Sequence, residues 1–185
     1  EKAGKYIDFL NANAYDKERD VRTNIAGEFQ KSNLAAALQT AELICGRLDE
    51  DKIYEALSQI RISGRMEEIA PGIIVDVSHN IQGMQGFVQT VEANYHGMKK
   101  RILFAASHQN EEEYMKNILK TIPEIEAFYT VGIHKRRINE AEFQDAFRKM
   151  IDRNQETTVC FVVGSFYLAG MAKEFINQEE ENVRL

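Results

Sequence analysis

The sequence is poor in the residue types that mark several other classes of protein. It has two cysteines, two prolines and no tryptophan in 185 residues. Cys45 and Cys160 lie far apart, whereas a disulfide framework or a zinc site needs more cysteines at closer spacing. We therefore expect both cysteines to be buried as small apolar side chains in a reducing compartment, and the protein to be cytoplasmic.

Long apolar runs and an excess of positive charge are also lacking. No apolar run approaches the roughly 20 residues of a membrane-spanning helix, and no basic-then-apolar leader opens the sequence. Asp and Glu outnumber Lys and Arg by 29 to 23, which gives a formal net charge of −6. A protein that binds duplex nucleic acid usually carries a basic face. We expect neither nucleic acid nor a membrane as a partner.

The sequence contains no glycine-rich phosphate loop. Neither the strand–loop–Lys pattern of nucleotide-binding proteins nor a dinucleotide fingerprint occurs. The chain starts with Glu1 rather than Met, and its first 25 residues show no clean period, although residues 6–10 resemble a strand without partners. We expect a piece of a longer protein, which folds but does not turn over ATP alone.

Residues 32–60 carry apolar side chains at helical spacing. Ser32 or Asn33 is placed to cap a first helix, and Gly46 lies where that helix should end. Asp51 is placed to cap a second helix. The pattern predicts two consecutive helices in this region.

From residue 64 onward, short apolar runs alternate with segments of helical period. The predicted strands span residues 72–77, 101–106, 126–131 and 157–163, the predicted helices span residues 80–95, 111–122, 140–151 and 165–176, and residues 178–182 form a charged, frayed tail. This alternation predicts an α/β, Rossmann-like fold, a mainly parallel sheet with helices on both faces, preceded by the helical segment.

Ligands of such sheets bind beyond the carboxyl ends of the strands, and residues 76–80 (Asp-Val-Ser-His-Asn) follow the first buried strand. Asp76 can accept hydrogen bonds from ribose hydroxyls, and His79 can contact phosphate or substrate. In the alternative interpretation, Asp76 or Ser78 caps the next helix and His79 is a bystander.

Gly164 and Ser165 lie between the last strand and the last helix. Backbone N–H groups at such a turn can bind an anion, with the hydroxyl as a further donor. The residues alone favour a simpler interpretation, in which Ser165 is an ordinary helix cap. The charged run at residues 134–137 is typical of solvated surface.

Several segments together resemble one family in order and spacing. Residues 27–33 are similar to its Gly-x-His-Gln-x-x-Asn stretch, residues 64–67 to Gly-Arg-Leu/Phe-Glu, residues 76–80 to Asp-Gly-Ala-His-Asn, and residues 163–168 to Thr-Gly-Ser-Leu-Tyr. The family is the folylpolyglutamate and dihydrofolate synthases of the Mur ligase superfamily, and the resemblance covers residues 26–177.

The resemblance implies an ATP-dependent ligase that adds L-glutamate to a folate or dihydropteroate carboxylate through an acyl phosphate. Residues 1–61 would be the end of a central ATPase domain, which is otherwise missing and would hold the Mg2+, and residues 62–185 the Rossmann-like C-terminal domain. By their motif positions, Asn33 would lie near the adenine, and Arg65, Asp76 and His79 would reach ATP and the incoming amino acid. Ser165 would help to hold glutamate. No residue of this chain matches a catalytic group.

Some positions depart from the family pattern. Phe29 replaces a His, Ile81 replaces the Pro that often follows the Asn, and residues 109–112 replace an Asp-Lys-Asp segment. A muramyl peptide ligase, whose segment usually reads Asp-Tyr-Ala-His-x-Pro, is the enzymatic alternative, and Asn80 and the lack of Pro favour the folate branch. A noncatalytic Rossmann-like binding module is the alternative from another class.

Overall fold

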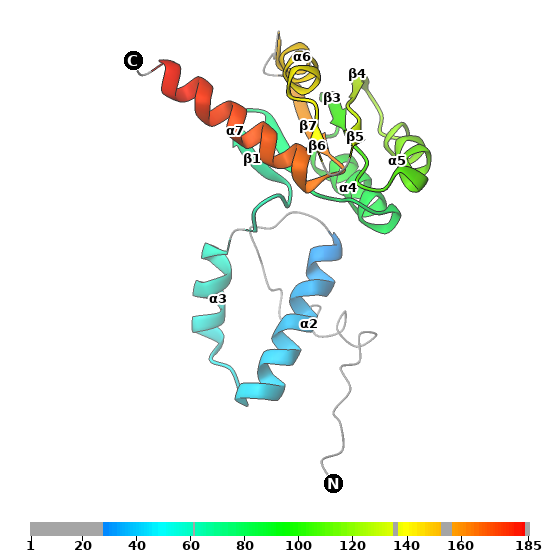
Figure 1. Cartoon of the computed structure of the whole chain (residues 1–185). Coiled ribbons are helices and arrows are strands. Elements are labelled where there is room, and N and C mark those ends of the chain that lie inside the picture. The colour runs from blue at the N-terminus through cyan, green and yellow to red at the C-terminus, as the bar shows by residue number, and fades with distance from the viewer. Residues whose placement is uncertain (1–27, 61, 135–136, 153–156, 184–185) are drawn as a thin grey trace. The chain divides into compact units, whose positions relative to one another are not determined.

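The computed structural model describes residues 28–60, 62–134, 137–152 and 157–183 (Figure 1). The chain divides into two compact units, Glu1–Ile62 and Ser63–Leu185. The strand predicted at residues 6–10 lies outside the described residues. The assignment of residues 1–61 to the end of an ATPase domain stays a prediction.

The described part of the first unit consists of two helices, α2 (Glu28–Cys45) and α3 (Glu50–Gln59). Leu38 and Leu57 form the centre of their small apolar contact. Gly46, at a φ of 83°, follows the end of α2 as predicted. The predicted cap of the second helix was wrong by two residues, because Asp49 accepts the hydrogen bond from the Lys52 amide.

The second unit alternates strands and helices as the sequence predicts. Its elements are β1 (Glu67–Ala70), β2 (Ile73–Asp76), α4 (Ile81–Asn94), β3 (Lys99–Phe104), the 3-10 turn η1 (Gln109–Glu111), α5 (Glu112–Leu119), β4 (Ile125–Thr130), β5 (Ile133–His134), β6 (Arg137–Ile138), α6 (Glu140–Ile151), β7 (Thr158–Val163) and α7 (Phe166–Val183). The sequence pattern missed β1, β5 and β6, because these strands are short and only partly buried.

Five strands form one sheet in the order β1-β2-β7-β3-β4. All neighbouring pairs are parallel except β1 and β2, which form an antiparallel hairpin. β7 lies in the middle and all six of its residues are buried, which agrees with its unbroken apolar sequence. The predicted fold class, a mainly parallel α/β sheet with helices on both faces, is confirmed.

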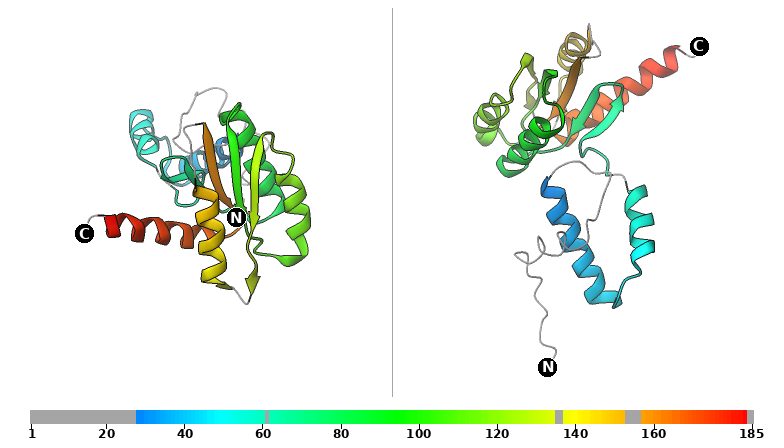
Figure 2. Two further views of the ribbon diagram at one scale, coloured as in Figure 1. Left: turned by 90° about the horizontal axis from the view of Figure 1, so that it is seen from above. Right: turned by 180° about the vertical axis from the view of Figure 1, so that it is seen from behind.

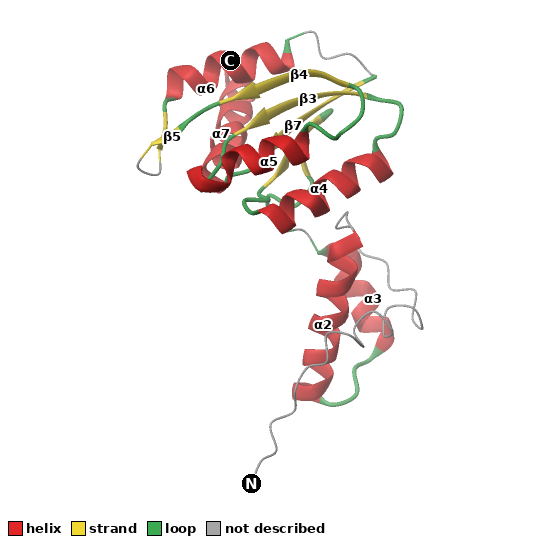
Figure 3. Ribbon diagram, turned by 90° about the vertical axis from the view of Figure 1, so that its right-hand side faces the viewer, coloured by secondary structure: helices red, strands yellow, loops and turns green. Residues whose placement is uncertain are grey.

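Helices cover the sheet in two pairs (Figures 2 and 3). One apolar cluster joins the sheet to α6 and α7 and contains Phe143, Phe147 and Phe175. The other cluster joins the opposite face to α4 and α5. Phe161 of β7 lies at the centre of that second cluster, with its ring edge-to-face against Phe87 at 5.5 Å. The two cores hold the strand ends in a fixed arrangement.

The last helix is longer than the sequence pattern indicates. α7 continues to Val183, whereas residues 178–182 were predicted to be a frayed tail. Arg148 of α6 explains part of the difference, because its guanidinium lies 4.8 Å from the centre of the Phe175 ring and pairs with Glu179 at 3.0 Å. Among the described residues, no helix has the length and apolar character to span a membrane.

The two cysteines have different environments. Cys160 is buried in β7, as predicted, and its thiol donates a hydrogen bond to the Met150 carbonyl at 3.4 Å. Burial raises the pKa of this thiol to about 11. Cys45 is exposed at the end of α2, so the prediction that both cysteines are buried was wrong for this residue.

This difference predicts that only Cys45 is reactive in the folded chain. At mildly alkaline pH, a thiol reagent such as Ellman's reagent should modify one cysteine per native chain and two after unfolding in urea, because the thiolate is the reactive form. A Cys45→Ser variant should then show no native reactivity. Rapid native modification of Cys160 would contradict the buried environment of β7.

Gly164 is predicted to tolerate no side chain. Its φ is 106°, and a Cβ would lie 2.5 Å from the Ala105 carbonyl oxygen and 2.6 Å from the Phe104 ring. Backbone strain alone costs about 1–3 kcal/mol, so Gly164→Ala should lower the free energy of unfolding, measured in urea, by at least that amount.

Gly170 of α7 offers a matched control, because nothing lies within 4 Å of the position of its Cβ. Gly170→Ala should leave stability unchanged or raise it by up to about 1 kcal/mol, through the better helix propensity of alanine. Equal stability of the Gly164 and Gly170 variants would contradict the close packing at the end of β7.

Candidate functional site at the carboxyl edge of the sheet

Four parallel strands end at the same edge of the sheet. The register aligns Asp76 of β2 with Val163 of β7, Val163 with Phe104 of β3, and Phe104 with Thr130 of β4. The segments that follow these strands therefore begin close to one another, as predicted. This edge is the position at which open α/β sheets bind ligands.

Asp76 is the last residue of β2, and its carboxylate faces inward. Only 1% of the residue is exposed. One carboxylate oxygen accepts hydrogen bonds from the Ser78 amide at 2.9 Å and the Ser78 hydroxyl at 2.5 Å, and the other accepts one from the Met66 amide at 3.0 Å. Asp76 thus lies at the strand end as predicted, but it holds two loops of its own chain together instead of facing solvent.

The turn at residues 64–67 (Gly-Arg-Met-Glu) is built on close backbone contacts. Gly64 has a φ of 72°, its carbonyl accepts a hydrogen bond from the Val77 amide at 2.8 Å, and a Cβ here would lie 2.6 Å from the Val77 side chain. Met66 has a φ of 45°, a strained value for a residue with a side chain, and the bond from its amide to Asp76 supports it. The turn fixes the backbone on both sides of Arg65.

Glu67 closes the same turn. Its carboxylate accepts hydrogen bonds from the Gly64 amide at 2.6 Å and pairs with Lys173 of α7 at 2.7 Å. Lys173 also donates a hydrogen bond to the Ser63 hydroxyl at 2.7 Å. Burial raises the pKa of Glu67, but the bonds from Lys173 and Gly64 outweigh this effect and hold the pKa below its ordinary value of 4.5.

None of these contacts uses the Arg65 side chain. The residue is partly buried, and its guanidinium makes no hydrogen bond or ion pair with any residue in the described part of the chain. A guanidinium is always charged and presents donors that fit phosphate or carboxylate oxygens. Arg65 is therefore the best placed cation for an anionic ligand at this edge.

His79 lies in the loop between β2 and α4 and is partly exposed. Its Nδ1 atom is 3.0 Å from the Val77 carbonyl oxygen, which can only accept, so Nδ1 carries the proton and Nε2 of the neutral ring is an acceptor. The ring lies 5.4 Å from that of Phe166. Phe166 and Tyr167 are 58% and 45% exposed, so aromatic surface lies beside His79.

Ser165 and Asn80 serve as helix caps. Ser165 is fully buried, and its hydroxyl accepts a hydrogen bond from the Tyr167 amide at 3.1 Å, in the first turn of α7. The side-chain Oδ1 atom of Asn80 accepts one from the Gly83 amide at 2.7 Å, so Asn80, rather than Asp76 or Ser78, caps α4. The suggested contact of Ser165 with glutamate stays a prediction.

Asn33 lies in the first unit, on α2. It is exposed, and its side-chain amide donates a hydrogen bond to the Gln30 side chain at 3.1 Å. The structure therefore brings Arg65, Asp76, His79 and Ser165 to one edge of the second unit, whereas Asn33 belongs to the other unit. Contact of any of these residues with a nucleotide stays a prediction.

Sequence reasoning missed two features of this edge. The first is the ion pair between Glu67 and Lys173, two residues that are far apart in the sequence. The Gly-Arg-Met-Glu motif includes Gly64 and Glu67, but it did not indicate the contact with Lys173. The exposure of the Phe166 ring was also missed, because a local apolar pattern does not show which aromatic side chains remain uncovered. In the described residues, no group of three or more His, Cys, Asp or Glu could hold a metal ion.

An α/β domain with this mostly parallel sheet and helices on both faces has the architecture of a Rossmann-like domain. No protein-family model matches the chain. The chain is 23% identical to dihydrofolate synthase/folylpolyglutamate synthase of Bacillus subtilis (strain 168) over 109 residues, which are 56% of the chain and 25% of that protein. The resemblance predicted from the sequence motifs is confirmed.

Solved structures share the fold. FolC of E. coli in complex with DHPP and ADP matches with a TM-score of 0.68 and 18% identity, over 80% of this chain and 39% of FolC. A pseudomurein peptide ligase type C from Methanothermus fervidus matches with a TM-score of 0.65 and 18% identity, over 85% of this chain and 37% of the ligase. The chain thus spans less than half of the proteins that it resembles.

The Glu67–Lys173 pair predicts a pH-dependent contribution to stability. The folded-state pKa of Glu67 lies below its unfolded value, so the contribution is complete above about pH 4.5 and disappears as the pH falls through the folded-state pKa. Lys173→Met should be less stable at neutral pH by about 0.2–1 kcal/mol, the range for exposed and partly exposed pairs.

Urea unfolding at neutral and acidic pH measures the difference in the free energy of unfolding between the Lys173→Met variant and the original chain. The difference in the free energy of unfolding should narrow as the pH falls through the folded-state pKa of Glu67, which lies below 4.5. A Glu67→Gln background should remove this pH dependence. A difference that stays constant or widens in acid would show that the pair does not stabilise the fold.

Proposed function

We propose that the chain forms part of an ATP-dependent ligase that adds L-glutamate to the carboxylate of a folate or dihydropteroate. In this reaction the carboxylate is phosphorylated, and the glutamate amino group then displaces phosphate to form an amide. The single observation that carries the proposal is the position of Arg65, which has no partner among the described residues. Arg65 lies on a turn that Asp76 holds, beside the loop of His79. The fold is shared with FolC in complex with ADP.

The edge offers groups that fit a nucleotide and an acidic substrate. Arg65 supplies a positive charge for phosphate oxygens, and Nε2 of His79 accepts a hydrogen bond from a hydroxyl or an amine. The exposed ring of Phe166 provides a flat apolar surface next to His79. Asp76 supports these groups indirectly, because its hydrogen bonds fix the loops on which they lie. Ser165 and Asn33 remain proposed contacts to glutamate and adenine.

The remaining equipment would come from the ATPase domain that precedes this region in the resembling family. That domain would supply the phosphate loop and the Mg2+ ligands, since the chain has no phosphate-loop motif. Closing two domains over the ligand excludes water from a reactive acyl phosphate. The isolated chain is thus proposed to fold without turning over ATP.

A peptide ligase of the muramyl type is the second candidate, and the match to a pseudomurein peptide ligase favours it. Asn80 is weak evidence for the folate ligase over the peptide ligase. Its side chain caps α4, and other good capping residues could do the same at this position. The acceptor distinguishes them. Release of ADP by the protein of the whole reading frame, with glutamate and either a dihydropteroate, a reduced folate or a muramyl peptide acceptor, tests the proposal directly.

His79→Ala in the protein of the whole reading frame should lower kcat/KM for ATP by up to about tenfold, the upper value of one ordinary hydrogen bond. The fold should be unaffected, because His79 is partly exposed and makes a single hydrogen bond with its own loop. Steady-state ligation kinetics and the urea midpoint measure these two effects.

His96→Ala is the matched control, since His96 is an exposed histidine on the loop between α4 and β3, at the opposite edge of the sheet. It should retain full activity. Equal activity of the two histidine variants would show that the carboxyl edge does not contact the nucleotide or substrate.

A further inference from the structure

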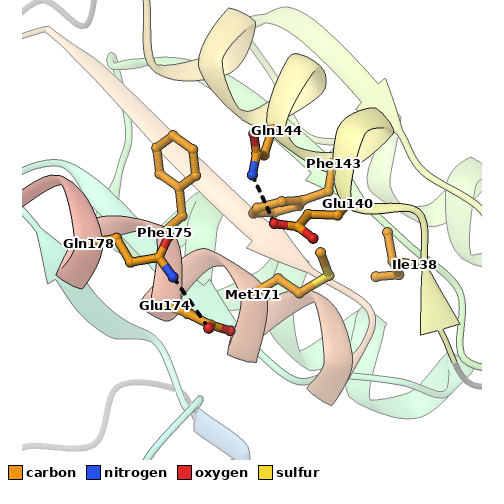
Figure 4. A pocket seen from close by; sticks show the side chains of 8 residues that line it. All are labelled: Ile138, Glu140, Phe143, Gln144, Met171, Glu174, Phe175 and Gln178. Carbon is orange, nitrogen blue, oxygen red and sulfur yellow. Dashed lines mark hydrogen bonds between the residues drawn. The ribbon is translucent and has the colours of Figure 1, made fainter.

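A groove lies between α6 and α7, and none of the candidate site residues lines it. Its volume is about 220 Å³. Figure 4 shows the residues that line it, which are Ile138, Glu140, Phe143 and Gln144 from β6 and α6, and Met171, Glu174, Phe175 and Gln178 from α7. Nothing in the proposed ligase function uses this groove.

The groove combines an apolar floor with an acidic rim. Phe143, Phe175 and Ile138 are buried, and Met171 is partly buried beside them. Glu140 and Glu174 are exposed and come from different helices, so the groove has a carboxylate on each side. Such a site favours a ligand that is apolar along its length and positively charged at its end.

Both carboxylates are held in place by neutral groups. The Gln144 side-chain amide donates a hydrogen bond to Glu140 at 3.1 Å, and that of Gln178 donates one to Glu174 at 3.4 Å (Figure 4). Each bond uses one carboxylate oxygen. Among the described residues, neither Glu140 nor Glu174 forms an ion pair.

The same two helices show how a cation fits in such a position. One helical turn further along α6, the Arg148 guanidinium lies over the Phe175 ring at 4.8 Å and pairs with Glu179 of α7 at 3.0 Å. Gln144 occupies the position equivalent to Arg148 one turn earlier, and it is neutral. The groove is therefore the place where the α6–α7 contact has an aromatic floor and acidic groups but no cation of its own.

We propose that this groove binds an arginine side chain of a protein partner. The aliphatic part of the arginine would lie on Met171 and Ile138, and its guanidinium would lie between Glu140 and Glu174. A planar guanidinium with several donors suits two carboxylates better than an ammonium does. The volume is below the roughly 300–1,000 Å³ of small-molecule sites, which argues for one long side chain and against a nucleotide.

A peptide titration tests the proposal with the whole chain. The probe is acetyl-Gly-Leu-Arg-Leu-Gly-amide, and its match is the same peptide with citrulline, which has nearly the same shape but no charge, in place of arginine. Carbon-13 labelled methionine methyl groups report binding by NMR, and the Met171→Leu variant assigns the Met171 signal. The arginine peptide should shift that signal saturably, and the citrulline peptide should not.

A Glu140→Gln/Glu174→Gln variant should bind the arginine peptide about tenfold more weakly or not at all. The matched control is Glu92→Gln/Glu113→Gln, which removes the same charge from exposed positions of α4 and α5 on the other face of the sheet. This control should bind like the original chain.

Three results of the peptide titrations would overturn the proposal. They are no shift of the Met171 signal, equal binding of the arginine and citrulline peptides, and unchanged binding by the Glu140/Glu174 variant. A concentration-dependent shift without any peptide, lost in that variant, would also overturn it, because a second copy of the chain would then be the occupant. None of these measurements depends on ligase activity, so they remain separate from the proposed function.

Discussion

The buried carboxylate of Asp76 is the interaction on which the arrangement of the candidate site depends. A charged group with 1% exposure is costly unless its oxygens are hydrogen-bonded. Three donors satisfy it here, two from Ser78 and one from the Met66 amide. These bonds tie the strand end to the turn that precedes β1 and to the loop that precedes α4. The positions of Arg65 and His79 follow from them.

Polar residues at the carboxyl edge fall into two groups with different tasks. Glu67, Asn80 and Ser165 accept hydrogen bonds from backbone amides, so their side chains complete turns and helix ends. Arg65 and Nε2 of His79 have no such task within the described residues. The described groups at this edge without such a task are thus the Arg65 guanidinium, Nε2 of His79 and the exposed ring of Phe166.

The two faces of the second unit differ in how their helices are joined. On one face, α4 and α5 contact the sheet through a cluster of apolar side chains. On the other face, α6 and α7 add the Arg148–Glu179 pair to an aromatic cluster, and the acidic groove lies one turn away. The α6–α7 contact thus combines an ion pair between the two helices with an aromatic cluster.

The sequence by itself determined the alternation of strands and helices, since apolar runs of β-branched residues and segments of helical period are local properties. It also placed Asp76, His79, Gly164 and Ser165 at strand ends, because each directly follows such a run. Only the tertiary structure decided which partners these side chains have within the chain. Asp76 accepts hydrogen bonds from the Met66 amide and from Ser78, and Ser165 accepts one from the Tyr167 amide. Their contact with a ligand stays a prediction. The clamp between Glu67 and Lys173, the exposure of Cys45 and the groove between α6 and α7 depend on residues distant in the sequence or on neighbours that a local pattern does not specify. A strand end can be predicted from nearby residues, but the direction of a polar side chain depends on which donors the folded chain brings to it.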